Sequence, residues 1–130
     1  MALVIDYKGG KNADSYKVSS WERENRFQAA LYMLVVERLL GLRAAGGLYV
    51  PLGSRKPPRG MVAAGVDELG TGYVSSDVLG PEPFREKLDW ALEQVRATDE
   101  RMRRGELGCD PDQCAWQGGC SYPSICRCES

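Results

Sequence analysis

Two charged residues near the start of the chain, Asp6 and Lys8, have types and spacing that suit chemistry on a phosphodiester. On a β-strand, residues two positions apart project from the same face, so this carboxylate and ammonium group would lie side by side. A carboxylate can bind Mg²⁺ or Mn²⁺, and an ammonium group can position an attacking water or stabilise charge on a phosphate. Taken alone, Asp-x-Lys is usually an ordinary surface charge pair, so the surrounding elements decide between the two interpretations.

The segment that carries this pair is predicted to be a strand followed by a helix. Ala2 to Tyr7 is a short apolar run, and Gly9 and Gly10 end it with typical turn residues. A helix is predicted from about Trp21 to Leu40, because Ser19 and Glu22 have the spacing of a capping box and a glycine follows Leu40. Apolar residues at spacings of three and four predict its core-facing stripe: Phe27, Leu31, Leu34, Val35 and Leu39.

Gln28 and Tyr32 are the polar candidates on this predicted helix. They lie four positions apart, so they share a face and can reach the same neighbour. Alternatively, Gln28 is an ordinary polar residue at the edge of the helix and Tyr32 is an aromatic residue of the core.

The rest of the core is predicted to be a hairpin and a second helix. Residues 46–52 and 61–66 read as two strands joined by a basic, proline-containing loop, and residues 67–80 read as a loop rich in glycine and serine. A helix can begin at Pro81 or Pro83 without losing a hydrogen bond. Its apolar stripe is predicted to comprise Phe84, Leu88, Ala91, Leu92, Val95 and Met102.

All five cysteines fall within the last 22 residues, which indicates a local metal site. Thiolates bind soft or borderline metals, so an iron–sulfur cluster and structural zinc both fit. The spacing lacks paired C-x2-C units, which disfavours a zinc ribbon, and unrelated free thiols are the remaining alternative. The residues are Cys109, Cys114, Cys120, Cys126 and Cys128.

Composition sets the broad class of the protein. The 130 residues, 43% apolar and 27% charged, are typical of a single soluble domain. A net charge of −1 provides no overall basic field, so binding to nucleic acid would depend on local features. Basic residues do cluster near the start and in the loop around Arg55, Lys56 and Arg59, although solvated loops explain such clusters equally well. Without a membrane-spanning run or a secretory signal, a cytoplasmic location and no membrane partner are expected.

Four segments together resemble a known family: Val-Ile-Asp-Tyr-Lys-Gly-Gly from position 4, Gln-Ala-Ala-Leu-Tyr from 28, Gly-Gly-Leu-Tyr-Val-Pro-Leu from 46, and the cysteine-containing stretch from 114. They are similar to the PD-(D/E)xK nuclease domain of RecB-like and AddB-like recombination enzymes. The resemblance implies a DNA exonuclease of repair or recombination. It further implies an α/β, partial restriction-endonuclease-like fold over residues 1–104, with a mixed central sheet flanked by helices, and a cysteine-rich tail over 105–130.

The same resemblance assigns roles to individual residues. Asp6 becomes a ligand of Mg²⁺ or Mn²⁺, Lys8 the catalytic lysine, and Gln28 and Tyr32 their supporting pair. In the tail, three cysteines would bind a [4Fe–4S] cluster whose fourth ligand in the family lies far upstream, where this chain has no cysteine. Cys109 or Cys128 could replace it, and Cys109 is preferred. The three cysteines are Cys114, Cys120 and Cys126.

The chain departs from the family at its beginning. In the family, a helix and two strands precede Asp-x-Lys, and one strand supplies a second acidic ligand. We therefore expect an incomplete nuclease that needs the N-terminal part of the domain or another polypeptide, with a helicase as a further expected partner. The edge of the Ala2 to Tyr7 strand would be exposed. Two other functions stay open: a CRISPR-associated exonuclease, and a non-catalytic interaction module stapled by metal.

Overall fold

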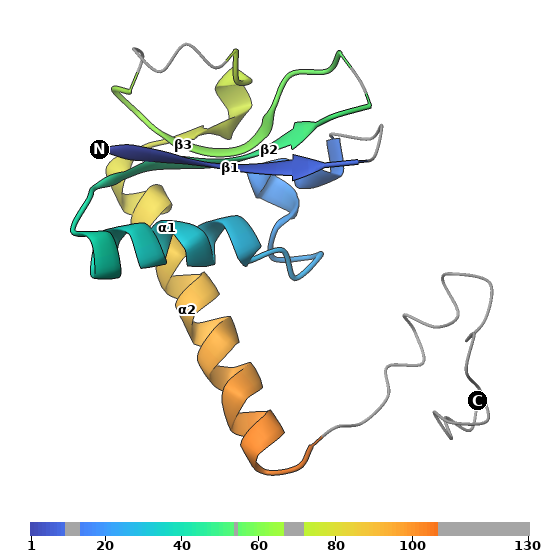
Figure 1. Cartoon of the computed structure of the whole chain (residues 1–130), viewed down its shortest axis with the longest axis vertical. Coiled ribbons are helices and arrows are strands. Elements are labelled where there is room, and N and C mark those ends of the chain that lie inside the picture. The colour runs from blue at the N-terminus through green and yellow to red at the C-terminus, as the bar shows by residue number, and fades with distance from the viewer. Residues whose placement is uncertain (10–13, 54, 67–71, 107–130) are drawn as a thin grey trace, which may run out of the picture. The chain divides into compact units, whose positions relative to one another are not determined.

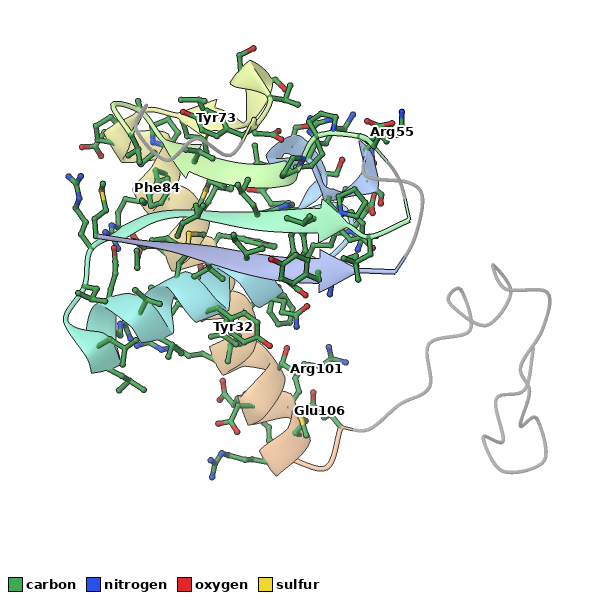
Figure 2. All side chains as sticks on the ribbon, turned by 45° about the horizontal axis from the view of Figure 1, so that its top comes forward. Tyr32, Arg55, Tyr73, Phe84, Arg101 and Glu106 are labelled. Carbon is green, nitrogen blue, oxygen red and sulfur yellow. The ribbon has the colours of Figure 1, made fainter. Side chains whose placement is uncertain are left out.

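The computed structural model describes residues 1–9, 14–53, 55–66 and 72–106. The chain divides into two compact units, Met1–Val95 and Arg96–Ser130. The first unit contains the sheet and the helices that position the candidate site. Within the described part of the second unit, arginines of the last helical turns form ion pairs, including Arg101 with Glu106, both labelled in Figure 2.

A four-stranded mixed sheet forms the centre of the first unit (Figure 1). Its strands lie in the order β1 (Ala2–Lys8), β2 (Ala44–Pro51), β3 (Arg59–Ala63) and β4 (Val78–Leu79). β1 pairs parallel with β2, β2 pairs antiparallel with β3, and β3 pairs parallel with β4. The α/β class, the mixed sheet and the hairpin predicted from the sequence are confirmed, and the arrangement is consistent with a restriction-endonuclease-like fold.

Two helices pack with this sheet. α1 (Gln28–Leu40) connects the parallel strands β1 and β2, as a crossover of that kind requires, and covers one face of the sheet (Figure 1). α2 (Pro81–Arg103) begins at a proline, as predicted. No helix among the described residues is long and apolar enough to span a bilayer.

The start of α1 differs from the sequence prediction. The chain forms a short 3₁₀ helix at Val18–Ser20, and Trp21 is fully buried, with its indole N–H donating to the Tyr16 carbonyl at 2.9 Å. Asn25 then takes a left-handed conformation, with φ of 49°, which no continuous helix permits. The capping box is therefore absent, and the helix begins seven residues later than Trp21.

The buried face of α1 also differs from the predicted stripe. Ala29, Ala30, Met33 and Leu34 are buried, whereas Val35 and Leu39 are 41% and 76% exposed. Apolar residues surround most of this helix, so periodicity alone could not select the face. The face that is buried is the one that fits the sheet at Gly47, where a Cβ atom would lie 3.0 Å from Met33 Cε and 3.1 Å from Ala29 Cβ.

Alternation along the strands divides the core into two clusters on opposite faces of the sheet. Tyr49 and Met61 belong to the cluster on the α1 side, while their neighbours Leu48 and Val62 belong to the other. Figure 2 labels one member of the first cluster, Phe84, and one residue packed against the second, Tyr73.

The remaining corrections concern short elements and the end of α2. β4 and a 3₁₀ helix at Ser75–Asp77 lie within residues 67–80, which were predicted to be a loop. The sequence does not reveal them, because a two-residue strand is too short to show a periodic pattern. Of the predicted α2 stripe, Phe84, Leu88 and Ala91 are buried, but Met102 is 59% exposed.

Candidate active site

Asp6 and Lys8 meet on the α1 side of the sheet, at the carboxyl end of β1. Lys8 Nζ lies 2.8 Å from Asp6 Oδ2, and the two side chains are 27% and 17% exposed, respectively. Tyr7, between them, is 61% exposed on the other face. The strand thus presents the two charged groups together, as its period of two predicts.

Gln28, the first residue of α1, joins this pair. The Lys8 ammonium donates a hydrogen bond to Gln28 Oε1 at 3.0 Å, and Gln28 Nε2 donates to the Tyr32 hydroxyl at 3.0 Å. Gln28 and Tyr32 are both exposed, whereas the alanines beside Gln28 are buried against the sheet. The structure therefore brings all four candidates, Asp6, Lys8, Gln28 and Tyr32, into one continuous set of contacts.

Tyr49 of β2 forms the floor beneath Lys8, and the sequence argument did not identify it. The parallel register places Tyr49 beside Asp6, and Lys8 Nζ lies 5.4 Å from the centre of the Tyr49 ring. The Tyr49 hydroxyl accepts a hydrogen bond from the Ala29 backbone N–H at 3.1 Å, which fixes the start of α1 against the sheet. Only the register of β1 against β2 reveals Tyr49 as a neighbour, because Asp6 and Tyr49 are 43 positions apart in the sequence.

Two pKa shifts describe the electrostatics of this site. The hydrogen bond and charge of Asp6 raise the pKa of Lys8 above its ordinary value of 10.5, against the opposing effect of burial. Burial raises the pKa of Tyr49 above 10.0. At neutral pH the site therefore contains a charged ammonium group above a neutral phenol.

Asp6 fits the role of a metal ligand. Its Oδ2 atom is buried, and its polar contact among the described residues is the Lys8 ammonium at 2.8 Å. A buried carboxylate with this cationic partner can also coordinate a hard divalent cation, which prefers oxygen ligands. Within residues 1–9, 14–53, 55–66 and 72–106, no group of three or more histidine, cysteine, aspartate or glutamate residues is arranged to bind a metal.

A pocket of about 320 Å³ opens beside Lys8 and Gln28. Its wall includes the segment between the 3₁₀ helix at Val18–Ser20 and α1, which sequence reasoning had placed inside a regular helix. The lining residues are Lys8, Glu24, Asn25, Arg26, Phe27, Gln28 and Tyr49.

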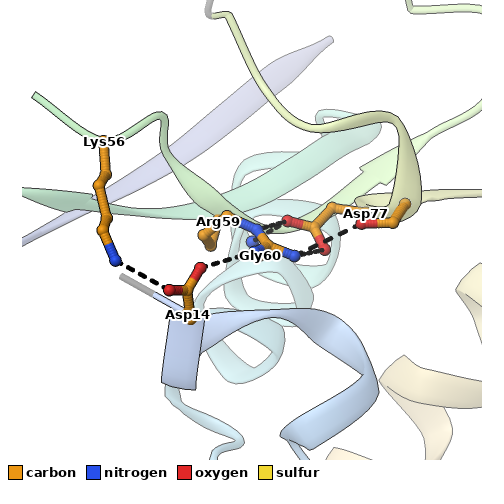
Figure 3. A network of polar contacts seen from close by, with 6 residues as sticks. Asp14, Lys56, Arg59, Gly60 and Asp77 are labelled. Carbon is orange, nitrogen blue, oxygen red and sulfur yellow. Dashed lines mark hydrogen bonds and ion pairs between the residues drawn. The ribbon is translucent and has the colours of Figure 1, made fainter. Parts of the chain in front are cut away.

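Some residues of the basic loop have a structural use (Figure 3). Arg59 is 9% exposed and contacts both carboxylate oxygens of the buried Asp77, through Nε at 2.7 Å and a terminal nitrogen at 3.1 Å. Its other terminal nitrogen reaches Asp14 at 3.3 Å, and Lys56 pairs with the same carboxylate at 2.9 Å. A solvated loop is therefore the wrong interpretation for Arg59, which ties β3 to the segment that follows β1.

The cysteines of the predicted metal site, Cys109, Cys114, Cys120, Cys126 and Cys128, lie outside the described residues. The site of the first unit is thus built from β1, β2, α1 and the segment that leads into α1.

Comparisons with known proteins bear on this arrangement. No curated protein and no solved structure matches the chain. Among protein families, the PD-(D/E)XK nuclease superfamily matches residues 1–127. Enzymes of that superfamily hydrolyse nucleic acids, DNA among them, and generally use divalent ions such as Mg²⁺ or Mn²⁺. Because this match spans nearly the whole sequence and the strand of Asp6 and Lys8 with it, the chain belongs to the PD-(D/E)XK nuclease superfamily.

Proposed function

We propose that this chain is the catalytic module of a metal-dependent DNA exonuclease of repair or recombination. The observation that supports it most directly is the meeting of Asp6, Lys8 and Gln28 on one face at the end of β1. An ordinary surface ion pair does not require a hydrogen bond to Gln28, the first residue of α1. The family match supports the reaction class, and the resemblance to recombination nucleases supports the narrower role.

Each residue has a distinct task in this proposal. Asp6 would hold the divalent ion through its carboxylate, and that ion would supply Lewis-acid activation for attack on phosphorus. The Lys8 ammonium donates hydrogen bonds to the attacking water or to a phosphate oxygen, stabilising charge that grows in the transition state. Gln28 holds the ammonium in place, and Tyr32 holds the Gln28 amide.

The second carboxylate that such metal sites normally need is proposed to come from an additional strand, in the N-terminal part of the domain or in a partner. The position of β1 supports this: within the described sheet it pairs with β2 alone, so its other edge can accept a strand. A helicase is the further partner that the resemblance favours.

The proposal extends to the cysteine tail, where Cys114, Cys120 and Cys126, with Cys109 as fourth ligand, bind a [4Fe–4S] cluster that staples the end of the chain. The expected observation is a brown protein whose visible absorbance disappears in Cys120→Ser. Stoichiometric zinc in a colourless protein would contradict the cluster.

The catalytic assignment is tested by comparing Lys8→Ala with Lys87→Ala, in whichever assembly cleaves DNA. Lys87 also forms an ion pair, with Glu22 at 2.5 Å, but it lies on α2 and does not line the pocket beside Lys8. We expect Lys8→Ala to slow Mg²⁺-dependent cleavage of linear DNA by at least about 100-fold and Lys87→Ala to leave the rate unchanged. Cleavage that survives in Lys8→Ala contradicts the assignment, and cutting of closed circular DNA contradicts exonuclease action.

A further inference from the structure

The pocket beside Lys8 contains a second cation, Arg26, that the proposed chemistry does not use. Lys8 and Arg26 both line this space of about 320 Å³, and Phe27 and Gln28 are among the other residues of its wall. The Arg26 side chain is 33% exposed, whereas that of Arg23, three residues earlier, is 75% exposed. Arg26 is therefore partly enclosed in the wall of the pocket, where a ligand at Lys8 could reach it.

Three contacts hold Arg26 in this position. Its guanidinium lies over the Tyr16 ring, 4.6 Å from the centre, and its Nε donates a hydrogen bond to Glu24 Oε2 at 2.9 Å. Its backbone N–H donates to the Trp21 carbonyl at 2.8 Å. Asn25, a residue type that tolerates the left-handed conformation, makes the turn between Trp21 and Arg26. The side chain is thus fixed before any ligand arrives.

The hydrogen-bonding capacity of Arg26 is only partly used. Among the described residues, its contacts occupy Nε and one face of the guanidinium, and its two terminal nitrogens make no hydrogen bond. A planar guanidinium with two terminal donors matches the oxygens of a phosphate. Glu24, which pairs with both Arg23 and Arg26, is the one carboxylate in the pocket lining, against the two cations Lys8 and Arg26, so the lining residues together carry a net positive charge.

We propose that Arg26 binds a backbone phosphate of the DNA strand adjacent to the phosphate at Lys8, so that the pocket guides the strand into the site. This inference rests on the proposed nuclease function and adds a substrate-binding residue to it. Because a phosphate contact carries no base information, the binding at Arg26 is independent of sequence.

The experiment measures equilibrium binding of a fluorescent single-stranded oligothymidine to the full chain in EDTA, where no metal-dependent cleavage occurs, across a series of salt concentrations. Arg26→Gln is compared with Arg23→Gln, because both variants remove a partner of Glu24 but only the first alters the pocket. We expect Arg26→Gln to weaken binding on the order of tenfold and to lower the magnitude of the salt slope by about 0.7, the value for one phosphate contact on a single strand. Arg23→Gln should bind within about twofold of the unsubstituted chain.

Equal losses in the two variants, or unchanged binding by Arg26→Gln, overturn the inference. Circular dichroism tests whether each variant folds. If Arg26→Gln does not fold, Arg26→Lys is used in its place. That variant should keep the salt slope and still lose affinity, because it retains the charge without the paired donors. Unchanged affinity in Arg26→Lys overturns the paired contact.

The outcomes separate this inference from the proposed function. If DNA binding depends on Arg26 but cleavage survives Lys8→Ala, only the catalytic assignment is contradicted. Cleavage that depends on Lys8, with binding indifferent to Arg26, contradicts the inference alone.

Discussion

Gln28 has the central position among the four candidate residues. An ammonium group can only donate hydrogen bonds, so the Gln28 atom that faces Lys8 must be the carbonyl oxygen, and the amide nitrogen then faces the Tyr32 hydroxyl. The orientation of the amide therefore follows from the chemistry of its neighbours. Because the amide contacts Lys8, we regard Gln28 as a positioning residue.

At this scale we predict that Gln28→Leu slows DNA cleavage about tenfold through kcat, with little change in KM, because Lys8 loses its fixed position without losing its charge. Tyr32→Phe should have a smaller effect, since the contact between Lys8 and Gln28 remains. Gln28 is exposed, so thermal unfolding of both variants should match that of the unsubstituted chain. A fall in the unfolding temperature of Gln28→Leu would instead assign Gln28 a structural role.

At the scale of elements, close backbone approaches set where the residues of the site meet. A Cβ atom at Gly60 of β3 would lie 2.2 Å from the Gly47 carbonyl oxygen of β2, so glycine is needed where these strands pair. Gly47 itself leaves room for Ala29 and Met33 on the buried face of α1. Together they fix β2, and therefore Tyr49, between α1 and β3.

The two helices are joined by a bidentate ion pair. Arg85 of α2 donates to both carboxylate oxygens of Glu37 in α1, at 2.9 and 3.2 Å. Arg85 is the largest cause of a Glu37 pKa below its ordinary value of 4.5. A depressed carboxyl pKa contributes stability that is present above the unfolded value and lost as the pH falls through the folded value.

We therefore predict that Glu37→Gln unfolds at lower urea concentration than the unsubstituted chain at neutral pH, and that this difference disappears as the pH falls well below 4.5. Urea titrations followed by circular dichroism at a series of pH values measure the difference. Glu86 on α2 is exposed and forms no ion pair among the described residues, so it provides the control, and Glu86→Gln should leave unfolding at neutral pH unchanged. A difference that persists at acid pH would show that Glu37 acts through packing.

At the scale of the whole molecule, one edge of the sheet stands out. β1 is the terminal strand of the described sheet, as expected from the sequence. Its outward residues Ile5 and Tyr7 are 43% and 61% exposed. An exposed apolar edge strand presents unpaired backbone groups to other chains, and a charged side chain on it prevents such pairing.

We predict that the chain by itself associates through this edge and that Ile5→Lys reduces the association, measured by sedimentation velocity over a range of concentrations. Leu39→Lys is the matched control, because Leu39 is 76% exposed but lies on α1. If Leu39→Lys alone makes the chain monomeric, association occurs through the helix and not through β1.

Several features could be predicted from the sequence because they depend on local geometry. The period of a strand puts Asp6 and Lys8 on one face, the period of a helix puts Gln28 and Tyr32 on another, and Pro81 begins α2. These relations involve residues at most four positions apart, or a single residue's own backbone preference. No distant part of the chain needs to be known.

Tertiary structure alone decided the rest. Tyr49 lies beneath Lys8 because two strands distant in sequence adopt one particular parallel register, and Arg26 lines the pocket because a left-handed Asn25 delays the start of α1. The buried face of α1 was likewise selected by Gly47. On the buried face of α1, packing against the sheet overrode local periodicity, since burial against a fitting surface stabilises a helix more than its intrinsic pattern does.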